Sequence, residues 1–98
     1  MPGDVFTIEP SRRKQKKWAV KVGGRTVNFG QKGYEDYTIH GDPRRKENYI
    51  ARHAAREDWD DLSTAGAWSR WILWNKPTLR GSARDMAKRF GVRIKVVE

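Results

Sequence analysis

The feature that most constrains the fold is the glycine pair Gly23-Gly24, which stands between two segments of alternating polar and apolar residues, KKWAVKV and RTVNFG. Alternation of this kind is typical of half-buried strands, and two glycines between such strands favour a tight β-turn. The apolar residues of both segments fall on one face: Trp18, Val20, Val22, Val27 and Phe29. The sequence therefore predicts a β-hairpin with one apolar face and one polar face.

Three helices are predicted after the hairpin, because residues 43–57, 64–75 and 78–90 carry apolar side chains at helical spacing. Asp42 is a suitable N-cap for the first helix, and Pro43 suits its first position. The second helix is apolar nearly all round, which is typical of a helix at the centre of a core or in contact with a partner.

A closing strand is predicted at 92–96 after a left-handed cap at Gly91, and we expect it to pair with the hairpin. A short strand is also predicted at Val5–Ile8. We expect residues 1–17 to form a mobile basic arm that includes this strand, and residues 18–98 to form one small α+β domain. The expected order of elements is β-β-β-α-α-α-β.

Composition narrows the class of protein. The chain of 98 residues has no cysteine, which excludes disulfides and thiolate metal sites. It has no apolar run of membrane-spanning length, and residues 1–17 lack the apolar centre of a signal peptide. We therefore expect a protein that is neither secreted nor embedded in a membrane. The 21 Lys and Arg against 12 Asp and Glu give a formal charge of +9, which favours a polyanionic partner.

The basic residues are organised along an arm, a hairpin and two helices, as contact with a phosphate backbone requires. The candidate nucleic-acid-binding residues are Arg12, Arg13, Lys14, Lys16, Lys17, Lys21, Arg25, Arg44, Arg45, Arg52, Arg56, Arg80, Arg84 and Lys88. The alternative is that each cluster is only a solvated flank. The four clusters support binding to nucleic acid only if the fold brings them onto one side.

The segment GYEDYTIHGDPRRK holds two tyrosines and a histidine in a polar stretch that leads into the first helix. Tyr34, Tyr37 and Tyr49 are candidates for stacking on bases, but tyrosines in such a segment more often pack their rings against the core. We expect Tyr34 and Tyr37 to pin the loop to the core. Asp36 or His40 is expected to satisfy backbone groups of the loop by hydrogen bonding.

Evidence for catalysis is weak in this sequence. His53 and Glu57 have i, i+4 helical spacing, and three aspartates, Asp58, Asp60 and Asp61, follow them. A divalent-metal nuclease site uses such carboxylates, but the paired-histidine motifs of metal sites are missing. We therefore predict no catalytic residues, no metal and no cofactor, and keep a metal-dependent nuclease as an alternative.

Much of residues 17–91 resembles a family of short basic proteins of unknown function from large double-stranded DNA viruses of iridovirus and phycodnavirus type and from related phages. The blocks that carry the resemblance are Gly33-Tyr34, Asp36-Tyr37, His40, Asp42, Arg45-Lys46, Tyr49-Ile50, Arg52-His53, Thr64-Ala65-Gly66 and Trp74-Asn75-Lys76-Pro77-Thr78. The chain departs from the family at Gly81 and Ala87, where the family favours a charged residue. The resemblance implies a viral or phage origin and assigns no reaction.

Three functions follow from these observations. The first is a non-enzymatic protein that binds nucleic acid, associated with packaged DNA. The second is a minor virion structural protein, of capsid-associated or cement type, that binds an acidic protein surface. The third is the metal-dependent nuclease. With the implied origin, the expected location is the host cytoplasm or the virion.

Overall fold

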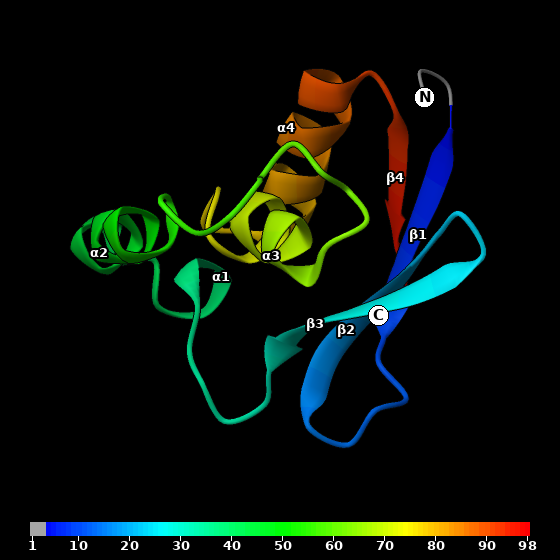
Figure 1. Cartoon of the computed structure of the whole chain (residues 1–98). Helices are drawn as coiled ribbons and strands as arrows, with labels where there is room; N and C mark the ends of the chain where they lie inside the picture. Colours follow the sequence, from blue (N-terminus) through cyan, green and yellow to red (C-terminus); the bar gives the residue numbers. More distant parts are fainter. Residues whose placement is uncertain (1–3) are drawn as a thin grey trace.

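The computed structural model describes residues 4–98, and it confirms the hairpin predicted around Gly23-Gly24. In chain order the elements are β1 (Val5–Pro10), β2 (Lys16–Val22), β3 (Arg25–Gln31), α1 (Tyr37–His40), α2 (Pro43–His53), α3 (Ala65–Trp68), the π-helical segment η1 (Ser69–Leu73), α4 (Leu79–Phe90) and β4 (Arg93–Val96). The strands form one sheet in the order β3-β2-β1-β4, and the helices lie to one side of it (Figure 1). The protein is thus a small α+β domain, as predicted.

The N-terminal segment belongs to the sheet. The strand expected at Val5–Ile8 is present and extends to Pro10, and it lies between β2 and β4. Phe6 and Ile8 are buried, which explains why this segment is a strand inside the domain and not the separate arm predicted over residues 1–17. Of that arm, residues 1–3 lie outside the described residues, and residues 11–15 form the turn between β1 and β2.

The closing strand joins the sheet as predicted, but its neighbour is β1 and not the hairpin. β4 runs parallel to β1, with Val5 opposite Arg93 and Thr7 opposite Lys95. β2 lies between β3 and β1, and the outer edge of β3 pairs with no strand in residues 4–98. The chain instead returns to the outer edge of β1 through the helical layer, as parallel strands require.

The first predicted helix is shorter than expected. α2 begins with Asp42 as N-cap and Pro43 at its first position, as predicted, but it ends at His53 and not at residue 57. Ala54 and Arg56 are exposed, so further helix would bury no apolar side chain. The side chain that α2 buries is Tyr49.

The second predicted helix changes its winding after one turn. α3 continues directly into η1, where the backbone N–H of Trp74 donates to the carbonyl of Ser69 at 3.1 Å, five residues earlier. The third helix agrees with its prediction. Thr78 caps α4 by accepting from Gly81 N–H, and Gly91 ends it with φ of 67°.

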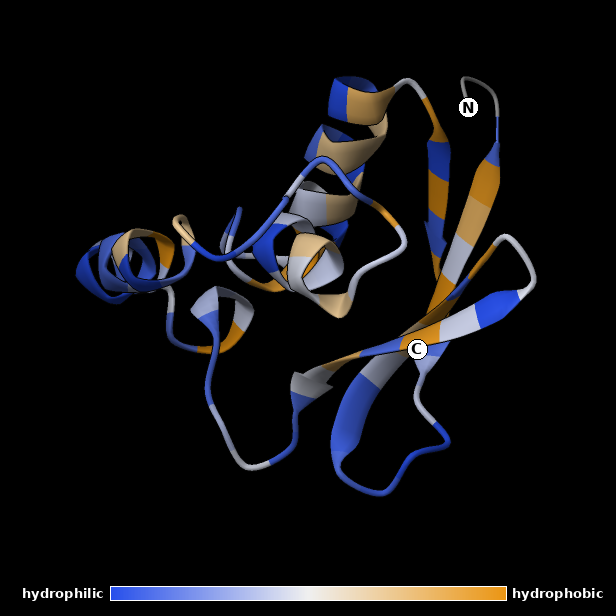
Figure 2. Ribbon diagram, viewed as in Figure 1, coloured by the Kyte–Doolittle hydropathy of each residue, from blue (hydrophilic) through white to orange (hydrophobic). Residues whose placement is uncertain are grey.

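The core lies between the sheet and the layer formed by α3, η1 and α4. Trp68 is at its centre, with no exposed surface, and its ring meets Phe6 edge-on at 5.4 Å. The other buried core residues are Ile8, Val20, Val27, Phe29, Trp71, Ile72, Leu73, Ala83, Met86 and Val92. Apolar and polar residues alternate along β4 in Figure 2, and its polar residues, Arg93 and Lys95, are exposed.

α2 stands apart from this core at the edge of the molecule, on the side away from β4 (Figure 1). Within residues 4–98, no helix is both long enough and apolar enough to cross a membrane.

Candidate functional site

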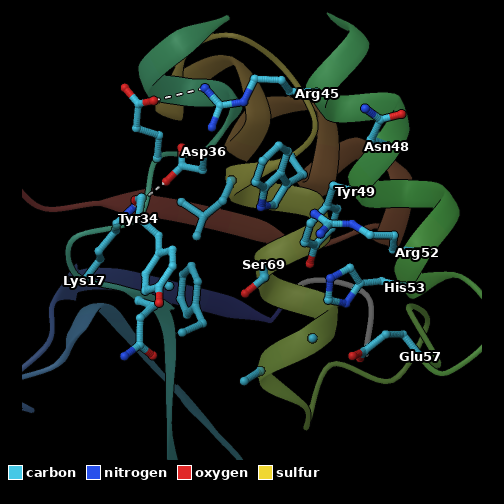
Figure 3. A pocket seen from close by; sticks show the side chains of 18 of the residues that line it. Lys17, Tyr34, Asp36, Arg45, Asn48, Tyr49, Arg52, His53, Glu57 and Ser69 are labelled. Carbon is cyan, nitrogen blue, oxygen red and sulfur yellow. Dashed lines mark hydrogen bonds and ion pairs between the residues drawn. The ribbon is translucent and has the colours of Figure 1, made fainter. Parts of the chain in front are cut away.

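A groove of about 1030 Å³ separates α2 from the side of the domain formed by β3, α3 and η1 (Figure 3). We call it the α2 groove. One wall comes from α2: Arg45, Asn48, Tyr49, Arg52 and His53. The opposite side includes Lys16, Lys17, Phe29, Tyr34, Ser69 and Leu73. The groove therefore combines basic and aromatic side chains that are far apart in the sequence.

A buried ion pair fixes the loop at one end of the groove. The Lys17 Nζ lies 2.7 Å from the Asp36 carboxylate, which is almost fully buried, and it also donates to the backbone carbonyl of Tyr34. The same carboxylate accepts from the N–H of Thr38 and so caps α1. His40 Nδ1 accepts from the N–H of Asp42 at 2.9 Å. The hydrogen bonding expected of Asp36 or His40 is confirmed for both.

Tyr34 was expected to pin the loop to the core, but its ring does not do so. Its side chain is 70% exposed, and it is the backbone carbonyl of Tyr34 that Lys17 holds. The ring stands at the rim of the α2 groove, on the side away from Arg52 and His53 (Figure 3). The loop is thus held by its backbone, while its aromatic side chain faces solvent.

Three stacked rings join α2 to the rest of the domain. Tyr49 lies parallel to Trp74, with ring centroids 4.4 Å apart, and His53 covers its other face at 4.3 Å. Burial, followed by the nearby charge of Glu57, raises the pKa of Tyr49 to about 12. Since both faces of the Tyr49 ring are covered, this tyrosine has no face left for a base.

Tyr37 is also engaged within the protein. The Lys46 ammonium lies 5.0 Å from the centre of its ring, and the same ammonium donates to the carbonyl of Asn75 at 2.7 Å. Burial and the neighbouring charges of Arg70 and Lys76 lower the pKa of Lys46. Of the three tyrosines predicted to stack on bases, Tyr34 is the one whose ring is largely exposed.

The π-helical turn at Ser69–Leu73 sets the position of Trp74. The backbone N–H of Trp74 donates to the carbonyl of Ser69, and the carbonyl of Trp74 accepts from Arg70 Nη1 at 2.8 Å. The Arg70 guanidinium also lies over the Trp71 ring at 4.4 Å, and its burial lowers its pKa. π-turns are frequent at functional sites, and this one directs Trp74 onto the helix that forms the groove wall.

The acidic cluster after α2 serves its own turn. Asp58 accepts from the N–H of Asp60 at 3.2 Å, and Asp61 accepts from both the hydroxyl and the N–H of Ser63. The hydrogen bond from the Ser63 hydroxyl, followed by the one from the Ser63 N–H, lowers the pKa of Asp61. Over residues 4–98, no three histidine, aspartate or glutamate side chains are grouped as a metal ion would require.

His53, Glu57 and Ser69 all line the α2 groove, but their contacts form no catalytic arrangement among the described residues. The His53 ring is stacked on Tyr49, and no hydrogen bond joins it to Glu57 or Ser69 in the part of the chain that is described. The Glu57 carboxylate lies against Gly66, where it would collide with any Cβ. This geometry assigns no nucleophile and no general base.

The predicted basic residues do not gather on one side. Lys16, Lys17, Arg45 and Arg52 line the α2 groove. Arg44 and Arg56 are exposed near the two ends of α2, and Arg25 is exposed at the end of the hairpin. Arg84 and Lys88 are exposed on α4, Arg80 lies at the start of α4 and pairs with Glu98, and Arg12, Arg13 and Lys21 line a hollow on the far side of the sheet. Lys14 is exposed in the turn beside Arg13.

The sheet face opposite the helices forms a second basic surface, which we call the open sheet face. It carries Val5, Thr7, Lys21, Thr26, Asn28, Arg93 and Lys95. Arg93 and Lys95 were not among the predicted residues. The signal was present, however, since they alternate with Ile94 and Val96, which pack against the core. A hollow of about 620 Å³ on this face is bordered by Arg12 and Arg13 from the β1–β2 turn.

Comparison with known proteins gives one match. The sequence pattern of a family of unknown function (DUF5754) matches residues 6–53, just under half of the chain. The matched part runs from β1 to the end of α2 and so includes the Lys17–Asp36 pair and one wall of the α2 groove. Searches of the curated proteins and of the solved structures found no match. The family description carries no function and no source, so the viral origin stays a prediction.

Proposed function

We propose that this protein binds nucleic acid through phosphate contacts made by the open sheet face. The observation that supports this most directly is that two lysine–threonine pairs lie on this face. Lys95 of β4 lies opposite Thr7 of β1, and Lys21 of β2 lies opposite Thr26 of β3. Thr7, Lys21 and Thr26 also line the same hollow.

The spacing of these pairs suits a phosphate backbone. Neighbouring strands are about 4.8 Å apart, so a lysine and the threonine opposite it can reach the same phosphate. Lysine and arginine side chains donate to phosphate oxygens, and threonine hydroxyls add further contacts. Such contacts read no bases, so we expect little sequence preference.

The charge of this face is not neutralised from within. Lys17, Arg45 and Arg80 form ion pairs with Asp36, Glu35 and Glu98. By contrast, five basic residues of the open sheet face and its border form no ion pair with any acid in residues 4–98: Arg12, Arg13, Lys21, Arg93 and Lys95. Glu9 is the acidic residue that lines the same hollow. The face therefore attracts polyanions.

The test is the salt dependence of binding to a random-sequence duplex, measured by fluorescence anisotropy. Contacts from these five residues predict a log–log slope of about −4.5. In the double variant Lys21→Ala/Lys95→Ala the slope is expected to fall to about −2.7. Both side chains are exposed, so the variant is expected to fold.

The matched control is Arg84→Ala/Lys88→Ala, which removes the same charge from the outer side of α4. It should leave the slope close to that of the unmodified protein. If both double variants reduce the slope equally, binding depends on net charge alone and the open sheet face has no special role. If the unmodified protein does not bind the duplex at low salt, the proposal fails, and an acidic protein surface becomes the expected partner.

A further inference from the structure

The α2 groove has a different character from the open sheet face, because it combines an exposed ring with an unpaired guanidinium. We infer that it holds one unpaired nucleotide of a single strand, with the base on the Tyr34 ring and a phosphate at Arg52. This inference rests on the proposed binding of nucleic acid, and it adds a site that prefers single strands. Figure 3 shows Tyr34 and Arg52 on opposite sides of the hollow.

The ring of Tyr34 is presented from a fixed loop. Lys17 holds the Tyr34 carbonyl and is itself held by the buried Asp36 carboxylate at 2.7 Å. The Tyr34 N–H donates to the carbonyl of Gln31, which closes the turn before it. A ring that is 70% exposed on a backbone tied in this way costs little further ordering when a base stacks on it.

The cationic side of the groove depends on Arg52. Arg45 also lines the groove, but its guanidinium lies 3.0 Å from Glu35. Arg52 forms no ion pair with an acid in residues 4–98, and it is exposed on the same helix. Glu57, the acid that lines the groove beside Arg52 and His53, is packed against Gly66. An arginine in this position can meet a phosphate with two parallel hydrogen bonds.

The groove lining also includes apolar side chains beside the charged groups. Phe29, Leu73 and Trp74 contribute to it, and ligand sites commonly combine apolar walls with a few polar groups. Bases in a duplex are stacked on one another, so only an unpaired base can lie on Tyr34. Single strands, ends and bulges are therefore the substrates that fit.

The test compares two single strands with the same number of phosphates, one of thymidylate and one with abasic sugars. Tyr34→Ala should weaken binding to the thymidylate strand about tenfold and leave binding to the abasic strand unchanged. Tyr34→Phe, which keeps the ring, should bind both strands as the unmodified protein does. Equal affinity of Tyr34→Ala and the unmodified protein for the thymidylate strand would overturn the inference.

Arg52→Ala and Arg56→Ala form a matched pair, since both remove an exposed arginine at the end of α2 but only Arg52 lines the groove. Arg52→Ala should weaken binding to both strands and Arg56→Ala to neither. Equal losses of affinity in Arg52→Ala and Arg56→Ala would exclude a phosphate site at Arg52. The Lys21→Ala/Lys95→Ala variant separates the two proposals. If this double variant loses duplex binding while Tyr34→Ala binds the thymidylate strand as the unmodified protein does, only the groove site is excluded. If the double variant keeps duplex binding while Tyr34→Ala loses affinity for the thymidylate strand, only the sheet site is excluded.

Discussion

Asp36 is the residue on which the loop before α2 depends most. Its carboxylate is 3% exposed, pairs with Lys17 and caps α1. Asp36→Ala leaves a partly buried ammonium without its partner and removes a cap, so we expect a loss of about 3 kcal/mol in the free energy of unfolding. Urea denaturation measures this loss.

The control is the neighbouring pair of Glu35 with Arg45, which is solvent-exposed. Glu35→Gln is expected to change the free energy of unfolding by less than about 1 kcal/mol. Similar losses in Asp36→Ala and Glu35→Gln would show that the buried pair does not organise the loop.

Asp85 predicts a dependence of stability on pH. The Asn75 side chain donates to its carboxylate at 2.7 Å, and this hydrogen bond, helped by Arg89 and Lys76, lowers the pKa of Asp85. A carboxyl whose pKa is lowered by folding stabilises the fold above its unfolded pKa of about 4 and loses that effect as the pH falls further. Asp85→Asn should therefore cost about 1 kcal/mol near neutral pH and nothing at low pH. Urea denaturation at the two pH values measures it, and a cost that does not change with pH would contradict the assignment.

At the scale of residues, the sequence predicted hydrogen bonding better than it predicted exposure. Hydrogen bonds of this kind follow from local chain chemistry, and the roles of Asp36 and Asp42 were predicted for that reason. Tyr34 was expected to pack and does not, while Tyr49 is buried between two rings. The exposure of an aromatic ring depends on partners that are distant in the sequence, such as Trp74.

Among the elements, α2 has the least support from the core. Its attachment depends on Tyr49, which is stacked on Trp74, and on Lys46, which donates to Asn75. Tyr49→Ala removes the stack and should cost about 3 kcal/mol. We expect amide hydrogen exchange in α2 to become fast, with protection retained in the sheet.

Tyr49→Phe is the control, because it keeps the stack and loses only the hydroxyl. It should exchange as the unmodified protein does. If Tyr49→Ala leaves the protection of α2 unchanged, the helix is held by contacts other than the stack of rings.

The accuracy of the element predictions follows the range of the interactions that decide each one. The hairpin and α4 depend on local patterns, and both were predicted almost to the residue. The end of α2 depends on what its last turn could bury, and the π-turn η1 lies in a segment whose side chains Trp71, Ile72 and Leu73 are buried. The parallel pairing of β4 with β1 depends on which sheet edge is free. None of these three is set by neighbours in the sequence.

For the whole molecule, the distribution of charge is the feature that the sequence left open. The fold separates the basic residues of the open sheet face from those of α4, which lie on the other side of the core. Sequence patterns do not distinguish between these surfaces, because they do not indicate which sheet face the helices cover. Lys95 joins Lys21 only through the pairing of β4 with β1 and of β1 with β2.

The most direct measurement is a nuclear magnetic resonance titration of the ¹⁵N-labelled protein with a random-sequence duplex at low salt. The account predicts that amide shifts change along the open sheet face, at Thr7, Lys21 and Lys95, while those of Arg84 and Lys88 on α4 stay in place. Changes confined to α4, or no changes at all, would contradict the claim that this face binds nucleic acid.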